Sequence, residues 1–170
     1  MLLLKKTSIF IDNLNLKIGK FFSWLLLFMV LLTCLIVILR YLFNIGFIWM
    51  QELVRFFYAA VFMLCAAYTL VENAHVRVDI FYSKMSEKNK NLVNLLGSIL
   101  FLIPVCFITF FYSFSYVINS WMQLEGSLEE RGLHAVFVMK TFIWLFAFML
   151  FAQALSLSLI HISEPTRQSL

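Results

Sequence analysis

Residues 21–39 read FFSWLLLFMVLLTCLIVIL, a run without one charged side chain between Lys20 and Arg40. A helix of this length is about 28 Å long, and about 20 mostly apolar residues are needed to cross a hydrocarbon core of about 30 Å. The stretch therefore predicts a membrane-spanning helix. No small-residue cleavage site follows it, so we expect an uncleaved span rather than a signal peptide.

The composition of the whole chain agrees with this prediction. Of its 170 residues, 63% are hydrophobic and 13% are charged, with a mean hydropathy of +0.93. Soluble domains are about 45–50% apolar and about 25% charged. A soluble core of this size could not hide so much apolar surface. We therefore predict an integral membrane protein. The net charge of +4 lies in short connecting segments, which gives no indication of a nucleic-acid partner.

Three further apolar runs predict three further spans, at about residues 49–71, 92–118 and 137–160. The third lies within a longer uncharged run, residues 91–124, so we expect it to tilt, to bend near Pro104 or to extend into the headgroups. The predicted fold class is an all-α integral membrane protein with four transmembrane helices, forming a single membrane domain over residues 1–170.

Basic residues in the short flanks predict the orientation, because cytoplasmic segments carry an excess of Lys and Arg. The flanks that an N-in, C-in arrangement places inside hold eight: Lys5, Lys6, Lys17, Lys20, Arg77, Lys84, Lys88 and Lys90. The opposite flanks hold about four: Arg40, Arg55, Arg131 and Lys140. We therefore predict that both termini are cytoplasmic.

Two other segments are amphipathic. Ile11, Leu14 and Ile18 recur at helical spacing, which predicts an N-terminal amphipathic helix lying in the membrane interface. Residues 127–130, Ser-Leu-Glu-Glu, form a capping-box pattern. That segment is either a short helix outside the membrane or a plain polar loop.

Residues that could perform chemistry are scarce. His75, His134 and His161 all lie outside the apolar runs, so no histidine pair could ligate a haem within the membrane. We find no metal-ligand cluster, no phosphate-binding glycine loop and no acidic residue deep in a span that could carry a proton. We therefore expect no catalytic residue, metal site or cofactor site in this chain.

Two clusters of polar residues stand out. Trp49, Glu52 and Arg55 follow Arg40 around the first hairpin, and the spacing of Glu52 and Arg55 places both on one helical face. This face is either a headgroup-level ion pair beside an interfacial tryptophan or a docking surface for a partner. The second cluster, HVRVDI at 75–80, alternates polar and apolar residues as a segment crossing the interface does.

The order and spacing of these motifs resemble those of a known family. The chain has RYLFN at 40–44, WMQELVR at 49–55 and ENAHVRVD at 72–79. Over about residues 10–155 it resembles the small membrane (Q-type) subunit of tripartite ATP-independent periplasmic (TRAP) transporters. One departure is Gly-Leu-His at 132–134, where the family often has Gly-Leu-Pro. The residues that match the family motifs are Arg40, Trp49, Glu52, Arg55, His75, Arg77 and Asp79.

The resemblance implies a division of labour in the bacterial inner membrane. A large membrane subunit would carry solute and sodium, and a soluble periplasmic solute-binding protein would capture solutes such as a dicarboxylate or sialic acid. This chain would be a small scaffold subunit surrounded by membrane lipids, with the seven matching residues in subunit-interface or structural roles. Sodium is expected in the partner subunit.

Two other functions are open to a chain of this kind. One is an autonomous small four-helix transporter, and the other is a membrane-anchor subunit of a redox complex. Co-purification with a much larger membrane protein would separate a scaffold subunit from an autonomous transporter.

The C-terminal segment has an unusual sequence. Residues 157–167, LSLIHISEPTR, resemble one translated reading frame of a transposase sequencing adapter. We therefore expect residues 157–170 to be a non-native tail, the alternative being a genuine short polar tail.

The topology can be tested with a single cysteine. Replacing Ser86 by Cys in a cysteine-free background should give a protein that only a membrane-permeant thiol reagent labels in intact cells, because the predicted orientation places the segment 72–91 in the cytoplasm. Labelling of that cysteine by an impermeant reagent would overturn the N-in, C-in assignment.

Overall fold

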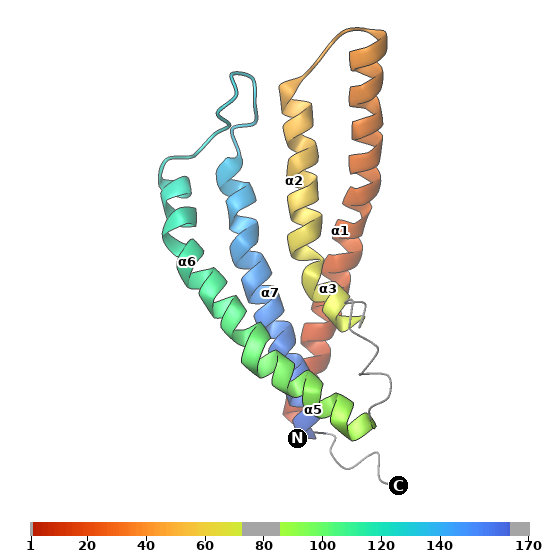
Figure 1. Ribbon diagram of the computed structural model, residues 1–170, viewed down its shortest axis with the longest axis vertical. Coiled ribbons are helices and arrows are strands. Elements are labelled where there is room, and N and C mark those ends of the chain that lie inside the picture. Colours follow the sequence, from red (N-terminus) through yellow and green to blue (C-terminus); the bar gives the residue numbers. More distant parts are fainter. Residues whose placement is uncertain (1, 73–85, 164–170) are drawn as a thin grey trace.

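The computed structural model describes residues 2–72 and 86–163, and every regular element in these ranges is helical (Figure 1). The elements are α1 (Leu2–Leu42), α2 (Ile48–Leu64), α3 (Ala66–Val71), α5 (Glu87–Gly97), the π-helical turn η1 (Ser98–Leu102), α6 (Ile103–Met122) and α7 (Val136–Ser163).

Four helical stretches are long and apolar enough to cross a membrane: Lys6–Leu42, Ile48–Val71, Leu92–Met122 and Val136–Ser158. They confirm the predicted all-helical, four-span architecture. The beginning of α1 and the end of α7 lie at one end of the molecule, as an even number of spans requires (Figure 1). The first hairpin and the α6–α7 loop lie at the other end, called the loop end below.

The N-terminal amphipathic segment is helical as predicted, but it is not a separate element. Helix α1 continues without interruption from Leu2 to Leu42. The polar side chains of this N-terminal segment bond to α7, which keeps the segment in line with the rest of α1. Asn15 Nδ2 donates to Gln153 Oε1 at 2.7 Å, and the Ser8 and Ser156 hydroxyls are 2.7 Å apart. Gln153 Nε2 and the Ser156 hydroxyl also donate to Asp12 Oδ1, at 2.9 and 2.8 Å.

Helix α7 is the centre of the bundle and packs against all three other spans. The buried core lies where α2, α3, α6 and α7 meet, with residues of α1 packed against it. Small side chains bring the helices close together, since Ala60 and Ala67 are almost fully buried. Gly19 of α1 lies so close to the Tyr68 ring that a Cβ atom there would be 2.7 Å from Tyr68 Cδ2.

The third span contains a π-helical turn just before its proline. The N–H of Ile103 bonds to the carbonyl of Ser98, five residues earlier, and Pro104 follows at the beginning of α6. A proline inside a regular α-helix removes one backbone bond and clashes with the carbonyl four residues earlier. The wider π turn relieves this conflict. The expected irregularity near Pro104 is thus present, and the span runs obliquely to its neighbours (Figure 1).

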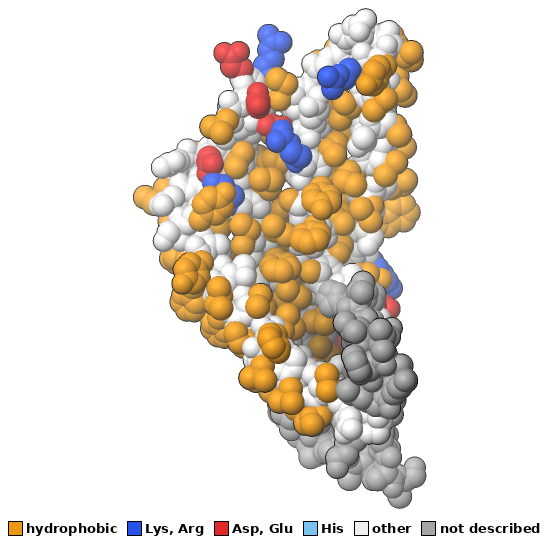
Figure 2. Space-filling view, viewed as in Figure 1, with side chains coloured by type: hydrophobic (Ala, Val, Ile, Leu, Met, Phe, Trp, Pro, Cys, Tyr) orange, Lys and Arg blue, Asp and Glu red, His pale blue; other side chains and the backbone are white. Residues whose placement is uncertain are grey.

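Charged side chains gather at the loop end in Figure 2, and a further blue and red group lies beside the grey segment. Apolar side chains cover the flank of the bundle on this face. Exposed large apolar residues of α1 include Phe21, Trp24, Phe28 and Leu31. Between α6 and α7, residues 123–135 form no helix. The plain polar loop is therefore the correct alternative for the capping-box sequence at 127–130.

Candidate functional site at the loop end of the bundle

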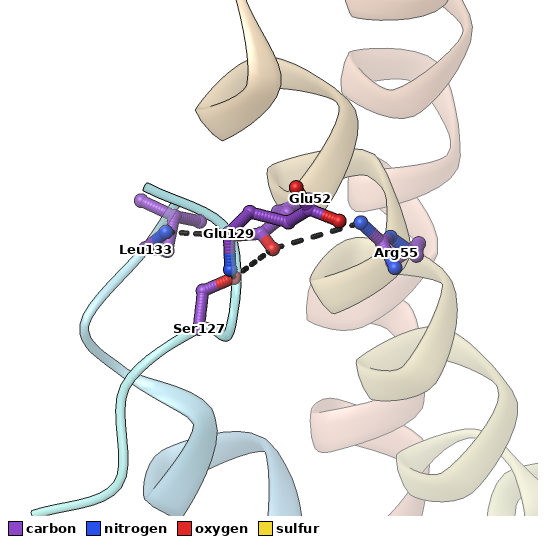
Figure 3. Close-up of polar contacts among 5 residues, drawn as sticks. All are labelled: Glu52, Arg55, Ser127, Glu129 and Leu133. Carbon is purple, nitrogen blue, oxygen red and sulfur yellow. Dashed lines mark hydrogen bonds and ion pairs between the residues drawn. The ribbon is translucent and has the colours of Figure 1, made fainter. Parts of the chain in front are cut away.

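The candidate site is the place where the loop 123–135 meets the first turns of α2. Glu52 lies in the second turn of α2 and is 7% exposed, although it is a carboxylate near the end of a membrane span. A buried carboxylate is tolerated only where donors satisfy its oxygens. Figure 3 shows that the donors come from the loop.

Both oxygens of Glu52 are bonded. The Ser127 hydroxyl donates to Oε1, and the backbone N–H of Leu133 donates to Oε2 at 2.5 Å (Figure 3). The loop is also closed on itself, because the N–H of Ser127 donates to the Leu133 carbonyl at 3.0 Å and the N–H of Glu129 donates to Ser127 Oγ at 3.1 Å. We call Glu52, Ser127 and Leu133 the loop clamp.

Gly132 leaves room for this clamp. A Cβ atom on Gly132 would lie 2.6 Å from Glu52 Oε2 and would also clash with the Ser127 side chain. Gly126 is similarly crowded, since a Cβ atom there would lie 2.6 Å from His134 Nδ1. Because they lack a Cβ atom, both glycines allow neighbouring side chains to lie close to the loop backbone.

Arg55 pairs with Glu52 from the outer side of α2. Its guanidinium lies 3.6 Å from Glu52 Oε1, which agrees with the helical spacing, but its side chain is 68% exposed (Figure 3). Exposed ion pairs contribute about 0–1 kcal/mol. The bonds from Ser127 and Leu133 therefore hold Glu52 more firmly than Arg55 does, and the Arg55 guanidinium remains open to a neighbour.

A second contact holds the beginning of the same loop. Lys140 of α7 is buried, donates to Glu125 and lies 3.8 Å from the centroid of the Tyr116 ring. This ammonium holds the pKa of the Glu125 carboxyl below its usual value. The stabilisation is therefore present above the ordinary carboxyl pKa and is lost as the pH falls through the lowered value.

The other residues singled out in the sequence are not part of the clamp. Arg40 lies exposed in the last turn of α1, and Trp49 is 41% exposed in the first turn of α2, with its ring 6.3 Å from the Phe47 ring. In the ranges that the structure covers, neither bonds to Glu52 or Arg55. His75, Arg77 and Asp79 lie outside the described residues.

Sequence reasoning missed the partners of Glu52. The capping-box pattern pointed to Ser127, but as a cap for a local helix rather than as a donor to a distant carboxylate. Leu133 contributes only its backbone, so its side chain gave no signal. Gln153 is a polar residue inside an apolar run, and this contrast could have indicated its bonds to α1.

Across the described part of the chain, no three metal-ligating side chains come together. The polar groups that we observe join helices to one another and to the loop. The chain is thus a multi-pass helical membrane protein whose polar side chains bond mainly within the bundle.

Comparison with known families then places the chain among transport proteins. Residues 29–163 match the family "Tripartite ATP-independent periplasmic transporters, DctQ component". The match covers most of the chain, so the protein belongs to this family and is the small membrane component of a TRAP transporter. Searches of the curated proteins and of the solved structures gave no match.

The loop clamp predicts how easily the loop opens to protease. Glu52→Ala removes acceptors for two hydrogen bonds, and bonds to a charged group contribute about 1.5–3 kcal/mol each. Trypsin should therefore cleave after the exposed Arg131 at least about ten times faster in this variant than in the wild type. Gly132→Ala should shift the rate in the same direction, because its methyl group displaces the clamp.

Glu129→Gln is the matched control, because Glu129 is exposed and its carboxylate is not part of the clamp. Cleavage of Glu52→Ala at the wild-type rate would show that Glu52 does not hold the loop.

Proposed function

We propose that this chain is the fixed scaffold subunit of a sodium-coupled uptake transporter in the bacterial inner membrane. In this proposal a large membrane subunit transports the solute, and a periplasmic solute-binding protein delivers it. The solutes are carboxylates of the dicarboxylate or sialic acid type. This chain has no catalytic role and holds no cofactor, and sodium binds to the large subunit.

The observation that carries the scaffold role is the distribution of polar and apolar side chains. Asn15 bonds to Gln153 between α1 and α7, and Trp121 Nε1 donates to Thr141 Oγ1 at 2.8 Å between α6 and α7. These polar groups are thus used for packing the bundle. The flanks present apolar side chains such as Phe21, Trp24 and Phe111. A subunit of this kind meets its neighbours side by side in the membrane.

Arg55 is the residue we assign to the subunit contact. Intramembrane charges usually face protein rather than lipid, and the Arg55 side chain is largely exposed on its own bundle. Glu52 acts on the same surface indirectly, because it positions the loop beside Arg55. Trp49 lies six residues before Arg55, on a different side of α2, so its interface role rests on the motif resemblance. We extend the same interface role to His75, Arg77 and Asp79 on the strength of the motif resemblance.

The loop end is the side on which we place the binding protein. With both termini in the cytoplasm, the first hairpin and the loop 123–135 lie in the periplasm. The loop is held in one conformation by Glu52 and Lys140, and its tip exposes Leu128, Glu129 and Glu130. A preorganised surface costs less entropy to dock than a mobile one.

Co-purification tests the scaffold role. The tagged chain, extracted from membranes of its source with mild detergent, should bring down a much larger multi-pass protein. Sodium-dependent uptake of a carboxylate in vesicles should require both chains. Recovery of the tagged chain alone, with uptake intact, would instead indicate an autonomous transporter.

Arg55→Ala tests the subunit contact. Removing one member of a buried charge pair at an interface costs about 2–5 kcal/mol, so recovery of the large subunit should fall by at least tenfold. Lys17→Ala, which removes an exposed cation of α1 elsewhere, should leave recovery unchanged. Equal recovery with both variants would show that Arg55 faces lipid headgroups rather than the partner.

A further inference from the structure

A hollow lies at the loop end, between the end of α1 and the beginning of α2. Its volume is about 450 Å³, and it is lined by Arg40, Asn44, Ile45, Gly46, Ile48 and Gln51. It is separate from the loop clamp, because none of these residues belongs to the contacts of Glu52 described above. Three of its side chains carry hydrogen-bonding groups, and one of them is a cation.

The turn that builds the hollow has a defined conformation. Asn44 has a φ of 52°, in the left-handed region that often ends a helix. The N–H of Ile45 then turns back to the carbonyl of Leu39 at 3.0 Å. The chain reverses here, so that Asn44 and Gln51 line the same hollow as Arg40.

Arg40 differs from Arg55 and Lys140, two other cations at this end of the bundle, in having no acidic partner. Arg55 pairs with Glu52, and Lys140 pairs with Glu125. Among the residues that the structure covers, no ion pair forms at Arg40. The C-terminal turn of a helix favours a cation, which accounts for a basic residue there. This preference of the helix end does not explain why the guanidinium lines a hollow together with two amide side chains and no carboxylate.

The depth of the hollow indicates what could fill it. Tyr41 is 78% exposed and Trp49 is 41% exposed at the ends of the two spans, and such aromatic residues mark the headgroup level of a membrane. At that level the abundant anionic group is phosphate. Arginine binds phosphate with its planar fork of donors, and amide N–H groups add further donors.

We propose that the hollow at Arg40, Asn44 and Gln51 is a binding site for a phosphate group. The guanidinium carries the charge, and the two side-chain amides donate to the remaining oxygens. The lining holds one cation and no carboxylate, so a ligand with net negative charge is favoured over a zwitterion. The phosphate belongs either to an anionic lipid such as phosphatidylglycerol or to free inorganic phosphate.

Native mass spectrometry of the full chain tests the proposal. The protein is reconstituted in phosphatidylcholine containing a minor fraction of phosphatidylglycerol, then released into mild detergent. The wild type should retain phosphatidylglycerol over phosphatidylcholine. Arg40→Gln should retain it about tenfold less, which is the loss of one charged hydrogen-bonding group. Arg40→Lys keeps the charge without the fork and should lie between the two.

Arg131→Gln is the control, because it makes the same change of charge in an exposed loop residue outside the hollow, and it should retain the lipid as the wild type does. Displacement of the lipid by millimolar inorganic phosphate, in the wild type alone, would assign the site to free phosphate. Equal lipid retention by wild type and Arg40→Gln, with no phosphate binding, would overturn the proposal. The proposal would also be overturned if Arg40→Gln lowered recovery of the large subunit but left lipid retention unchanged, since Arg40 would then bind a protein carboxylate.

Discussion

Glu52 places a carboxylate near the beginning of a membrane-spanning helix, where it is almost entirely shielded from solvent. Such a group costs several kcal/mol unless donors replace its hydration. In this protein the donors are the Ser127 hydroxyl and the Leu133 N–H, both from a loop more than seventy residues away in the chain. The requirement of the Glu52 carboxylate for hydrogen-bond donors thereby determines where the loop between α6 and α7 lies. Gly132 supplies the space that the contact requires.

The same constraint acts at the opposite end of the bundle. Asn15 and Gln153 satisfy each other between α1 and α7, and Ser156 bonds to Asp12. Between the two ends, packing relies on small and apolar residues such as Ala60, Ala67 and Gly19. Polar contacts therefore set the register of the helices at both ends, while close packing holds the middle. A bundle fixed in this way is consistent with the scaffold role proposed above.

The sequence was sufficient for the elements that depend on local hydrophobicity. Each of the four spans could be placed to within a few residues, apart from the longer α1, because an uncharged run of about 20 residues has few alternatives to crossing a membrane. The helical spacing of Glu52 and Arg55 also placed both side chains on one face, with an ion pair as one of two alternatives, and the two side chains lie 3.6 Å apart. The continuity of α1 was not predictable in this way, since it depends on α7 partners for Ser8 and Asn15 that lie far away in the chain. The same holds for the loop clamp, in which Leu133 contributes a backbone group that any residue but proline could supply.

Hydrogen exchange at single amides measures directly whether Glu52 holds the loop in one conformation. The Leu133 N–H donates to the Glu52 carboxylate and should exchange much more slowly than the N–H of Leu128, whose side chain is fully exposed at the tip of the same loop. Protection of Leu133 should disappear in Glu52→Ala while protection in the middle of α7 remains. If the Leu133 amide exchanges as fast as that of Leu128 in the wild-type protein, the clamp does not exist in solution and the loop is not held by Glu52.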